Sequence, residues 1–413
     1  MTTPDRPRVL MLLENGPYSR DARVPKEAET LVSAGYQVTV ICPGEQDLPR
    51  RDQQSGVRIY RFRPPPEGEG LLGYALEYGY AMVAVFLLSL LVWWREAFDV
   101  VHAHCPPDTF VFIGVFYKFL GKRFVYDHHD LSPELYSARC KGGHNPFVYR
   151  ILILLERFCC RLADHVIATN HSYKAVEMER GGVPETRITV VRNGPDLNRL
   201  KPGGPHPERR EDDQTWLGYV GWMGFQDGVD YLLRALHHLA HDLGRSDFHC
   251  ILAGTGDAMP TLDSLTEELG LGNHVSFAGW VAPHLVAHFL DRADICVAPE
   301  PSSPYNDRST AIKIMEYMAL GRPIVCFDLP ENRVTAQDAA AYARPNDELD
   351  FAQRIATLMD NPKRRKEMGK IGRERIETEL AWSHQEKHLL RAYEALEASS
   401  SRTRSVFWRR RSF

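Results

Sequence analysis

Short apolar runs that end in turns and lead into helical segments recur along the whole chain, and this alternation limits the fold more than any other feature. In the first half, Arg8 to Leu13 is followed by the turn Glu14 to Pro17, a helical stretch from Asp21 to Ala34 and a second run, Tyr36 to Cys42. This is a β-α-β unit, and its continuously apolar runs indicate strands buried on both faces of a parallel sheet. Further strands are expected at Val57 to Phe62, Asp99 to Ala103, Arg123 to Asp127, His165 to Ala168 and Ile188 to Val191.

A stretch rich in proline, glycine and charge, Leu200 to Asp213, interrupts this alternation, which then restarts. Such composition marks a linker. We therefore expect an α/β fold with two Rossmann-like doubly wound domains that face a cleft, with ligands bound beyond the carboxyl ends of the strands. The expected parts are a first domain at 1–205, a second domain at 214–380, a helix at 381–399 that packs back toward the first domain, and a disordered tail at 400–413.

Composition excludes several classes of protein. Of the 413 residues, 44% are hydrophobic and 25% are charged, which is the balance of an ordinary globular protein. A formal charge of -4 provides no overall basic field, so no nucleic-acid partner is expected. The eight cysteines include no C-x-x-C pair, which favours free thiols in a reducing compartment over disulfides or zinc. Because the N-terminus has no apolar signal-peptide core, a cytoplasmic location is expected.

The segment from Leu71 to Trp94 is strongly apolar, and Glu77 is its one charged residue. A helix packed on the sheet is the plain interpretation, because the uncharged part is at the lower length limit for a membrane span. Two alternatives stay open, a true span and a helix that presents apolar surface to a bilayer.

The tail combines five arginines between Arg402 and Arg411 with aromatic residues, and we expect it to be disordered. This composition suits an anionic membrane surface, although a nucleic-acid arm or an inert solvated tail would use the same residue types. Residues 71–94 and 402–413 together suggest peripheral attachment to the inner face of the cell membrane.

The stretch from Arg308 to Val325 predicts a helix that Ser309 or Thr310 caps and that Gly321 ends. Most of its positions are apolar, but Lys313 and Glu316 lie on one polar stripe with Ser309. An ion pair between Lys313 and Glu316 is one interpretation. The other is a ligand site in which Lys313 and the helix N-terminus hold a phosphate while Glu316 accepts hydrogen bonds from sugar hydroxyls.

Two further motifs carry weaker signals. Gly221, Gly224 and Gly228 are spaced like a phosphate-binding turn between a strand and a helix. The DHHD cluster from Asp127 to Asp130 invites a metal interpretation. Because successive residues of an extended chain point to alternate faces, these four cannot all reach one ion, and polar groups that line the cleft are favoured instead.

Taken together, these segments resemble the family 4 glycosyltransferases of the GT-B fold, over nearly the whole length of the chain. The resemblance is carried in the first half by DARVPKEAETLVSAGYQVTVI, DVVHAH and VYDHHDLSPELY, and in the second by LGYVGWMGFQDGVDYLLRAL, FAGWV and EYMALGRPIV. It implies a nucleotide-sugar donor held mainly by the second domain, a saccharide or lipid-linked acceptor held by the first, and transfer with retention of the anomeric configuration. No metal or other cofactor is implied.

Site residues follow from the same resemblance. Glu316 would bind the donor ribose, while Lys313 and the backbone amides near Ser309 and Thr310 would hold the diphosphate. The donor-binding residues matched in this way are Gly221, Gly224, Ser309, Thr310, Lys313 and Glu316. His129 matches the family histidine that contacts the donor sugar. Asn15 and Gly16 match the loop beside donor and acceptor, and Asp130 adjoins this cleft loop.

Two parts of the site depart from the family pattern. The first glutamate of the family's pair would fall at position 308, which is Arg308 here, and the basic residues of the phosphate turn would fall near Trp222 and Asp227. In our interpretation Arg308 and Lys313 take over that positive charge, so the catalytic candidates are His129, Lys313 and Arg308.

The expected function is that of a retaining glycosyltransferase in cell-surface polysaccharide synthesis. Two rivals are a nucleotide-sugar epimerase on the same architecture and a non-catalytic protein that binds sugar nucleotides.

Overall fold

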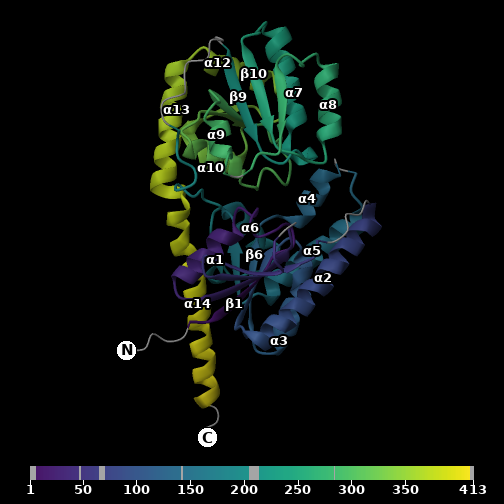
Figure 1. Ribbon diagram of the computed structural model, residues 1–413, viewed down its shortest axis with the longest axis vertical. Helices are drawn as coiled ribbons and strands as arrows, with labels where there is room; N and C mark the ends of the chain where they lie inside the picture. Colours follow the sequence, from purple (N-terminus) through teal and green to yellow (C-terminus); the bar gives the residue numbers. More distant parts are fainter. Residues whose placement is uncertain are drawn as a thin grey trace. The chain divides into compact units, whose positions relative to one another are not determined.

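The computed structural model describes residues 6–45, 48–64, 70–140, 143–203, 214–282 and 284–409. The chain forms two compact units, each built on one sheet (Figure 1). The first unit is Met1–Pro133, Asn145–Asn193 and Gln385–Phe413, and the second is Glu134–His144 and Gly194–His384. The two expected α/β domains are therefore present, but the expected single boundary is wrong in detail, since 134–144 belong to the second unit. Most of the expected linker, 204–213, lies outside the described residues.

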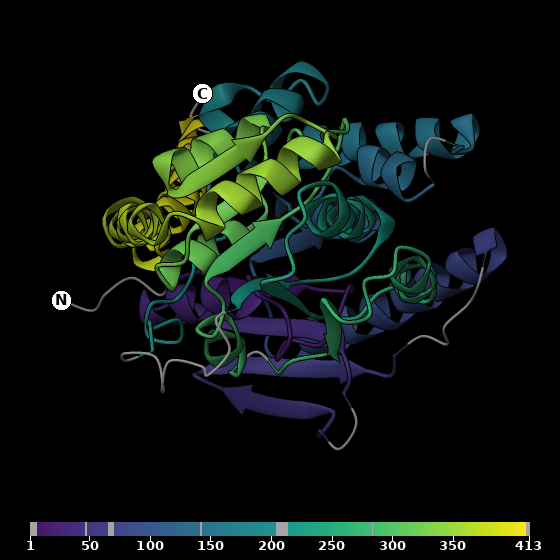
Figure 2. The same cartoon turned by 90° about the horizontal axis from the view of Figure 1, so that it is seen from above.

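The first unit contains an eight-stranded sheet of order β3-β4-β2-β1-β5-β6-β7-β8, part of which is seen in Figure 2. All neighbouring strands are parallel except β3 and β4. The strands are β1 Arg8–Leu12, β2 Gln37–Pro43, β3 Arg51–Gln54, β4 Val57–Phe62, β5 Val100–Cys105, β6 Arg123–His128, β7 His165–Ala168 and β8 Ile188–Val190. Strand β3 was not expected, because its residues are all polar and give no hydrophobic pattern. It is joined to β4 by a tight hairpin turn in which Ser55 and Gly56 both have positive φ.

Helices cover both faces of this sheet. They are α1 Val24–Ser33, α2 Gly70–Arg95, α3 Val111–Phe119, α4 Ser132–Arg139, α5 Pro146–Leu162, α6 His171–Glu179 and α14 Trp382–Arg409, of which α4 and α14 begin or end in the second unit. In the first unit α14 packs against β5 and the loop between α1 and β2, through a hydrogen bond of 2.8 Å between Tyr393 and His102 and an edge-to-face contact between Tyr393 and Tyr36. In the structure α14 extends to Arg409, and 410–413 lie outside the described residues, so the disorder expected for the tail at 400–413 stays a prediction.

The second unit contains a six-stranded parallel sheet of order β11-β10-β9-β12-β13-β14. Its strands are β9 Thr215–Val220, β10 Phe248–Ala253, β11 Val275–Gly279, β12 Ile295–Ala298, β13 Ile324–Phe327 and β14 Ala340–Ala343. Its helices are α7 Val229–His237, α8 Met259–Glu268, α9 Val286–Leu290, α10 Ile312–Ala319, α11 Pro330–Ala336, α12 Glu348–Met359 and α13 Pro362–Arg375. Shorter 3-10 and π segments are η1 Asp108–Phe110, η2 Glu185–Arg187, η3 Phe225–Asp227, η4 His238–Asp242, η5 Gln337–Ala339 and η6 Ile376–Leu380.

Each sheet has one point where the strand order reverses. In the first unit β2 and β5 flank β1 on opposite sides, and in the second unit β10 and β12 flank β9 in the same way. Ligand sites of doubly wound sheets form at the carboxyl ends of the strands beside such a reversal. All eight cysteines lie among the described residues and are free, and seven of them are buried, as expected.

Candidate functional site

In the second unit, Lys313 of α10 reaches the point where the strand order reverses. Its Nζ lies 2.5 Å from Oε1 of Glu300, which follows β12, and 3.8 Å from Oδ1 of Asp227, which follows β9. The ammonium also donates to the hydroxyl of Tyr219 on β9 at 3.1 Å and stands over that ring at 4.4 Å. Lys313 therefore pairs with Glu300 and Asp227 rather than with Glu316, which is half-buried one turn along the helix.

Burial and charge act in opposite directions in this group. Burial alone would lower the pKa of Lys313, but Glu300, Tyr219 and Asp227 outweigh it and hold that pKa well above its ordinary value. Burial raises the pKa of Asp227 to about 6; Lys313 opposes the shift and Glu300 adds to it. The ammonium thus stays charged at neutral pH, while the neighbouring Asp227 can gain or lose a proton close to it.

The two predicted glycines of the turn after β9 adjoin this group. Gly221 has φ +156°, and a Cβ there would lie 3.0 Å from Cε and 3.1 Å from Nζ of Lys313. Glycine at this position therefore makes room for the ammonium. The amide of Gly224 donates to Oδ2 of Asp227 at 3.1 Å, and Gly224 also borders a cavity of about 240 Å³ beside α7 and α8.

The expected helix start is wrong, because α10 begins at Ile312 after Ala311, with no side-chain cap. Ser309 and Thr310 are used elsewhere: the Ser309 amide donates to the Tyr305 carbonyl at 3.0 Å, and the Thr310 hydroxyl donates to Glu331 at 3.1 Å. The Ser309 amide, expected to hold a diphosphate, is thus already bonded. The expected end is confirmed, since Gly321 has φ +65° immediately beyond Leu320.

Arg308 precedes this segment on the surface. It is exposed, and its Nη1 donates to the backbone carbonyl of Pro304 at 2.9 Å. Among the described residues, the carboxylates that meet Lys313 are those of Glu300 and Asp227, and Arg308 takes no part in this group.

In the first unit, three loops meet at the carboxyl ends of β1, β5 and β6. The side-chain amide of Asn15, after β1, donates to the carbonyl of Pro106, after β5, at 2.9 Å. The backbone amide of His129, after β6, donates to the carbonyl of Cys105 at 2.9 Å. Asn15, its neighbour Gly16, His129 and the following Asp130 are thereby placed at one edge of the sheet, as the sequence motifs indicated.

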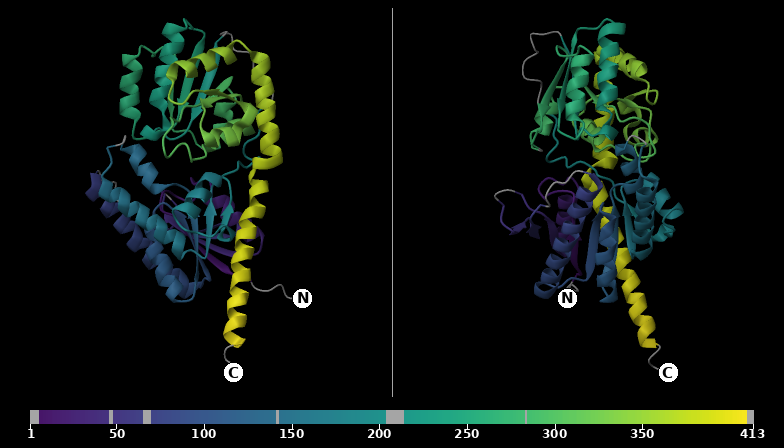
Figure 3. Two further views of the ribbon diagram at one scale, coloured as in Figure 1. Left: turned by 180° about the vertical axis from the view of Figure 1, so that it is seen from behind. Right: turned by 90° about the vertical axis from the view of Figure 1, so that its right-hand side faces the viewer.

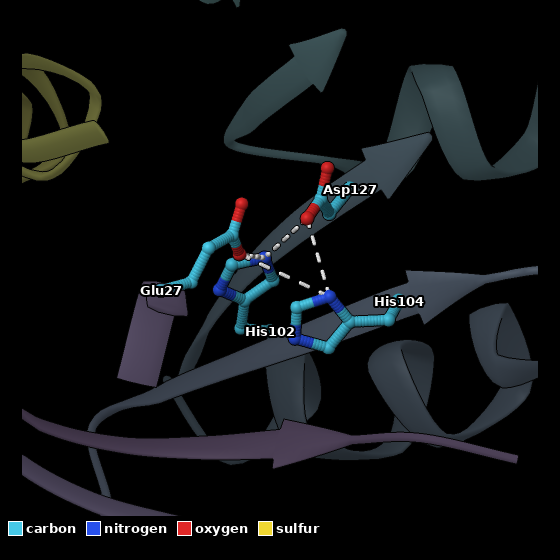
Figure 4. Close-up of side chains that lie close together, drawn as sticks. All are labelled: Glu27, His102, His104 and Asp127. Carbon is cyan, nitrogen blue, oxygen red and sulfur yellow. Dashed lines mark ion pairs between the residues drawn. The ribbon is translucent and has the colours of Figure 1, made fainter. Parts of the chain in front are cut away.

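A buried group of ionisable side chains lies directly beneath His129. It consists of Glu27, His102, His104 and Asp127, whose ligand-type atoms all lie within 4.8 Å of one another (Figure 4). Oδ2 of Asp127 is 3.4 Å from Nε2 of His102 and 3.2 Å from Nδ1 of His104. Two histidines and two carboxylates at this spacing are a possible donor set for a divalent metal.

Arg23 fills the role that a cation would have in this group. Its Nε and Nη2 bond the two oxygens of Asp127 at 3.0 Å each, and Nη2 lies 2.8 Å from Oε1 of Glu27. Burial alone would raise the pKa of Asp127, but Arg23 and His129 outweigh it and hold that pKa well below its usual range. Burial raises the pKa of Glu27 well above its usual range, so Glu27 is protonated and neutral. The negative charge of Asp127 is then balanced by the positive charge of Arg23. We therefore interpret the group as an ion-pair network that supports His129.

The neighbouring His128 faces the other side of the sheet, where its Nδ1 lies 3.2 Å from Oε1 of Glu177. The expectation that the DHHD residues point to alternate faces is therefore confirmed. Sequence reasoning missed Arg23, Glu27, His102 and His104 as members of the site. The sequence did contain patterns that could have identified them. Arg23 and Glu27 are spaced i, i+4 at the start of α1, and His102 and His104 are spaced i, i+2 on β5, which places each pair on one face of its element.

Comparisons with known proteins agree with this architecture. Residues 22–194 match the sequence family "Glycosyl transferase 4-like domain", and residues 214–361 match "Glycosyl transferases group 1". The chain is 28% identical over 306 residues to an uncharacterized glycosyltransferase, MJ1607, of Methanocaldococcus jannaschii, covering 72% of this chain and 73% of the relative. It is 25% identical over 370 residues to a glycogen synthase of Mycobacterium tuberculosis, covering 85% of each.

Solved structures share the fold. A sucrose-phosphate synthase from Thermosynechococcus elongatus superimposes with a TM-score of 0.78 at 18% identity, covering 95% of this chain and 100% of the other. Anabaena HepE, solved in complex with UDP and glucose, superimposes with a TM-score of 0.69 at 16% identity, covering 94% and 100%. The chain belongs to the family 4 type of glycosyltransferases, with the GT-B fold.

Proposed function

We propose that this glycosyltransferase moves a sugar from a nucleotide-sugar donor to a saccharide or lipid-linked saccharide acceptor, with retention of configuration, in cell-surface polysaccharide synthesis. The observation that carries the donor part is the buried ammonium of Lys313 beside Gly221, where the strand order of the second unit reverses. The complex of Anabaena HepE with UDP-glucose supports the same donor class.

In this proposal the donor diphosphate joins the ion-pair group of the second unit. The ammonium of Lys313 binds a phosphate oxygen, and the close approach of the backbone at Gly221 and Gly224 leaves space for it. Asp227 takes up a proton, which removes a negative charge from the neighbourhood of the diphosphate. Glu316 binds the donor ribose. The amides near Ser309 and Thr310 contact the diphosphate, for which the Ser309 amide exchanges its bond to the Tyr305 carbonyl.

Retention is proposed on the resemblance to the family, whose members use no protein nucleophile. The acceptor attacks on the face from which the diphosphate departs, and the leaving phosphate assists removal of its proton. The protein's task is then to position the reactants and to stabilise negative charge on the leaving group. His129 contacts the donor sugar, Asn15, Gly16 and Asp130 border the acceptor, and no metal cofactor is required.

We also propose that the enzyme works in the cytoplasm, peripherally attached to the inner face of the cell membrane. The supporting observations are the apolar segment 71–94 and the arginine-rich tail. A lipid-linked acceptor would be available at that surface.

Calorimetry with a panel of UDP-, GDP- and ADP-sugars, followed by NMR of the product, tests the donor and the stereochemistry. We expect one nucleotide class to bind and the product to keep the donor's anomeric configuration. Conversion of the donor to its epimer without an acceptor, or inversion in the product, would contradict the proposal. In the Glu316→Ala variant, nucleotide affinity should fall, and an unchanged affinity would remove Glu316 from the ribose site.

A further inference from the structure

Exposed hydrophobic side chains are concentrated on three helices of the first unit. Among the described residues, twenty large hydrophobic side chains are exposed, and thirteen of these belong to α2, α3 and α5 or to the residue that follows α3. Scattered exposed apolar residues are normal on a protein surface, whereas a concentration of this kind marks an interaction site.

On each helix the exposed residues form a stripe. Within each helix they recur at spacings of three, four or seven residues, which place them along one side of the helix, and Leu120 directly follows the last of them on α3. The stripe residues are Leu76, Tyr80, Val83, Leu87 and Trp94 on α2, Phe112, Phe116 and Phe119 with Leu120 at the end of α3, and Phe147, Ile151, Leu154 and Phe158 on α5. We call this set the α2–α3–α5 face.

The three stripes are neighbours in space. Phe86 of α2 makes an edge-to-face contact with Phe116 of α3 at 5.1 Å between ring centroids, and Phe112 of α3 meets Phe158 of α5 at 6.4 Å. Helix α3 thus links α2 and α5, and Figures 1 and 3 show all three helices on the outside of the unit. The exposed residues therefore belong to one continuous surface rather than to three separate patches.

Helix α2 packs along one side against the sheet of the first unit. Among the described residues, Leu76–Arg95 is long and apolar enough to cross a membrane, with a mean hydropathy of 1.8, and 22% of an 18-residue window within it is buried. Its buried side chains, Ala81, Val85, Ser89 and Val92, recur at helical spacing, and the Ser89 hydroxyl is 2.8 Å from the hydroxyl of Tyr117 on α3. Because one side is packed in this way, a span would require α2 to separate from its own domain.

Positive charge accompanies the apolar surface. Arg150, Arg157 and Arg161 are exposed on α5 at i, i+7 and i+11, adjacent to its apolar stripe. The one acidic residue of α5, Glu156, is fully buried and paired with Arg180. Apolar stripes flanked by arginines complement a surface that is anionic outside and apolar within.

We propose that the α2–α3–α5 face docks the enzyme on an anionic lipid bilayer. The exposed Phe, Leu and Trp side chains enter the boundary between headgroups and acyl chains, and the α5 arginines bind lipid phosphates. This deepens the proposed function, because it identifies the surface that would bring the first unit to a lipid-linked acceptor.

Liposome flotation of the full-length chain tests the proposal. Wild-type protein should float with vesicles of phosphatidylcholine and phosphatidylglycerol, and much less with phosphatidylcholine alone. The triple variant Leu87→Glu, Phe119→Glu and Leu154→Glu, with one change per helix, should stay in the soluble fraction. Arg150→Gln with Arg161→Gln should lower partitioning by roughly fivefold per arginine, because each basic residue near the surface contributes that much.

Controls separate docking from folding and from catalysis. Val334→Glu with Leu349→Glu changes exposed apolar residues of the second unit and should float like wild type. The triple variant should keep the wild-type melting temperature and the wild-type affinity for nucleotide in calorimetry. Nucleotide binding therefore tests the donor proposal independently of flotation, and either proposal can fail without the other. Three results would overturn the inference. One is flotation of the triple variant, the second is carbonate-resistant insertion, and the third is a lipid-independent dimer that the triple variant abolishes.

Discussion

Nε2 of His129 lies 3.0 Å from Oδ2 of Asp127, and the two oxygens of that carboxylate are also bonded by Arg23. The ring of His129 is thus fixed at its inner nitrogen, and Nδ1 is the nitrogen left for a ligand. His104 adds to this restraint, since its Nδ1 is 3.2 Å from the same Nε2. A histidine that contacts a donor sugar would gain from this fixation, because its geometry is set before the substrate binds.

Asp127→Asn should lower kcat by roughly 10- to 100-fold, since a small displacement of a positioned group costs about that much. The same change leaves Arg23 buried without its counter-charge and should destabilise the fold by about 3 kcal/mol. Steady-state kinetics at a temperature well below the melting transition measures the first effect, and thermal unfolding measures the second.

Glu156→Gln is the matched control for Asp127→Asn. Glu156 is a fully buried carboxylate of the same unit that pairs with Arg180 at 2.6 Å, and it belongs to the His128 side of the sheet. It should lose comparable stability and retain kcat. If Asp127 acts through His129, Asp127→Asn should have no further effect on kcat in a His129→Ala background; additive effects would exclude a positioning role.

Lys313→Ala should reduce turnover by about two orders of magnitude, because one preorganised charge on a leaving group contributes roughly 3 kcal/mol. The physical basis is the buried ammonium, whose pKa is held well above its ordinary value, so that it is charged whenever the donor arrives. Single-turnover kinetics with saturating donor measures this step.

Removal of Lys313 also leaves Glu300 and Asp227 without their shared cation, which could reduce activity through folding alone. A double variant, Lys313→Ala with Asp227→Asn, relieves part of that repulsion and should recover melting temperature but not turnover. Lys174→Ala, which breaks an ion pair of 2.8 Å with Glu185 in the first unit, should leave turnover unchanged. Recovery of turnover in the double variant would assign the loss to structure.

The sequence predicted the positions of the loops better than their contacts. Apolar runs that end in glycine or asparagine located Asn15 and Gly221 at carboxyl ends of strands, because strand and turn signals are local. The network around Asp127 could not be derived in that way. Arg23 and Asp127 are 104 positions apart. They meet because β6 joins the sheet through β5, a register that depends on the packing of the whole unit.

Local signals also failed where tertiary contacts compete with them. Ser309 and Thr310 are residue types that often cap helices. Here the Ser309 amide is bonded to the Tyr305 carbonyl and the Thr310 hydroxyl to Glu331, so α10 starts later. Residues 340–343 (AAYA) have helical propensity and form β14 because β13 offers an open edge. The apolar segment from 71 to 94 was recognised, but only the structure placed the stripes of α3 and α5 beside it.

Donor affinity should fall as the pH rises through about 6, the pKa of Asp227 in the free enzyme. A bound diphosphate favours the protonated carboxyl and raises that pKa further, so the complex holds more protons than the free enzyme above pH 6. Affinity therefore decreases by at most about tenfold per pH unit until the pKa of the complex is passed. Calorimetry in two buffers of different ionisation enthalpy should detect proton uptake at pH 7.

Asp227→Asn should make donor affinity independent of pH in this range, because the titrating group is gone. Asp230→Asn is the matched control, since Asp230 lies three residues further on and pairs with Arg234. It should keep the wild-type pH profile. A wild-type profile in Asp227→Asn would show that another group titrates.

Gly221→Ala should weaken donor binding, because the new methyl group would occupy the space that the Lys313 side chain uses. The added Cβ would lie 3.0 Å from Cε of Lys313, and the backbone there, with φ +156°, is one that residues with a side chain rarely adopt. We expect at least a tenfold rise in the dissociation constant of the nucleotide, together with a lower melting temperature. Gly272→Ala is the control, since a Cβ at that exposed glycine meets nothing within 4 Å, and it should bind like wild type. Equal affinities in the two variants would mean that the ammonium has room to move, and that the turn after β9 does not fix its position.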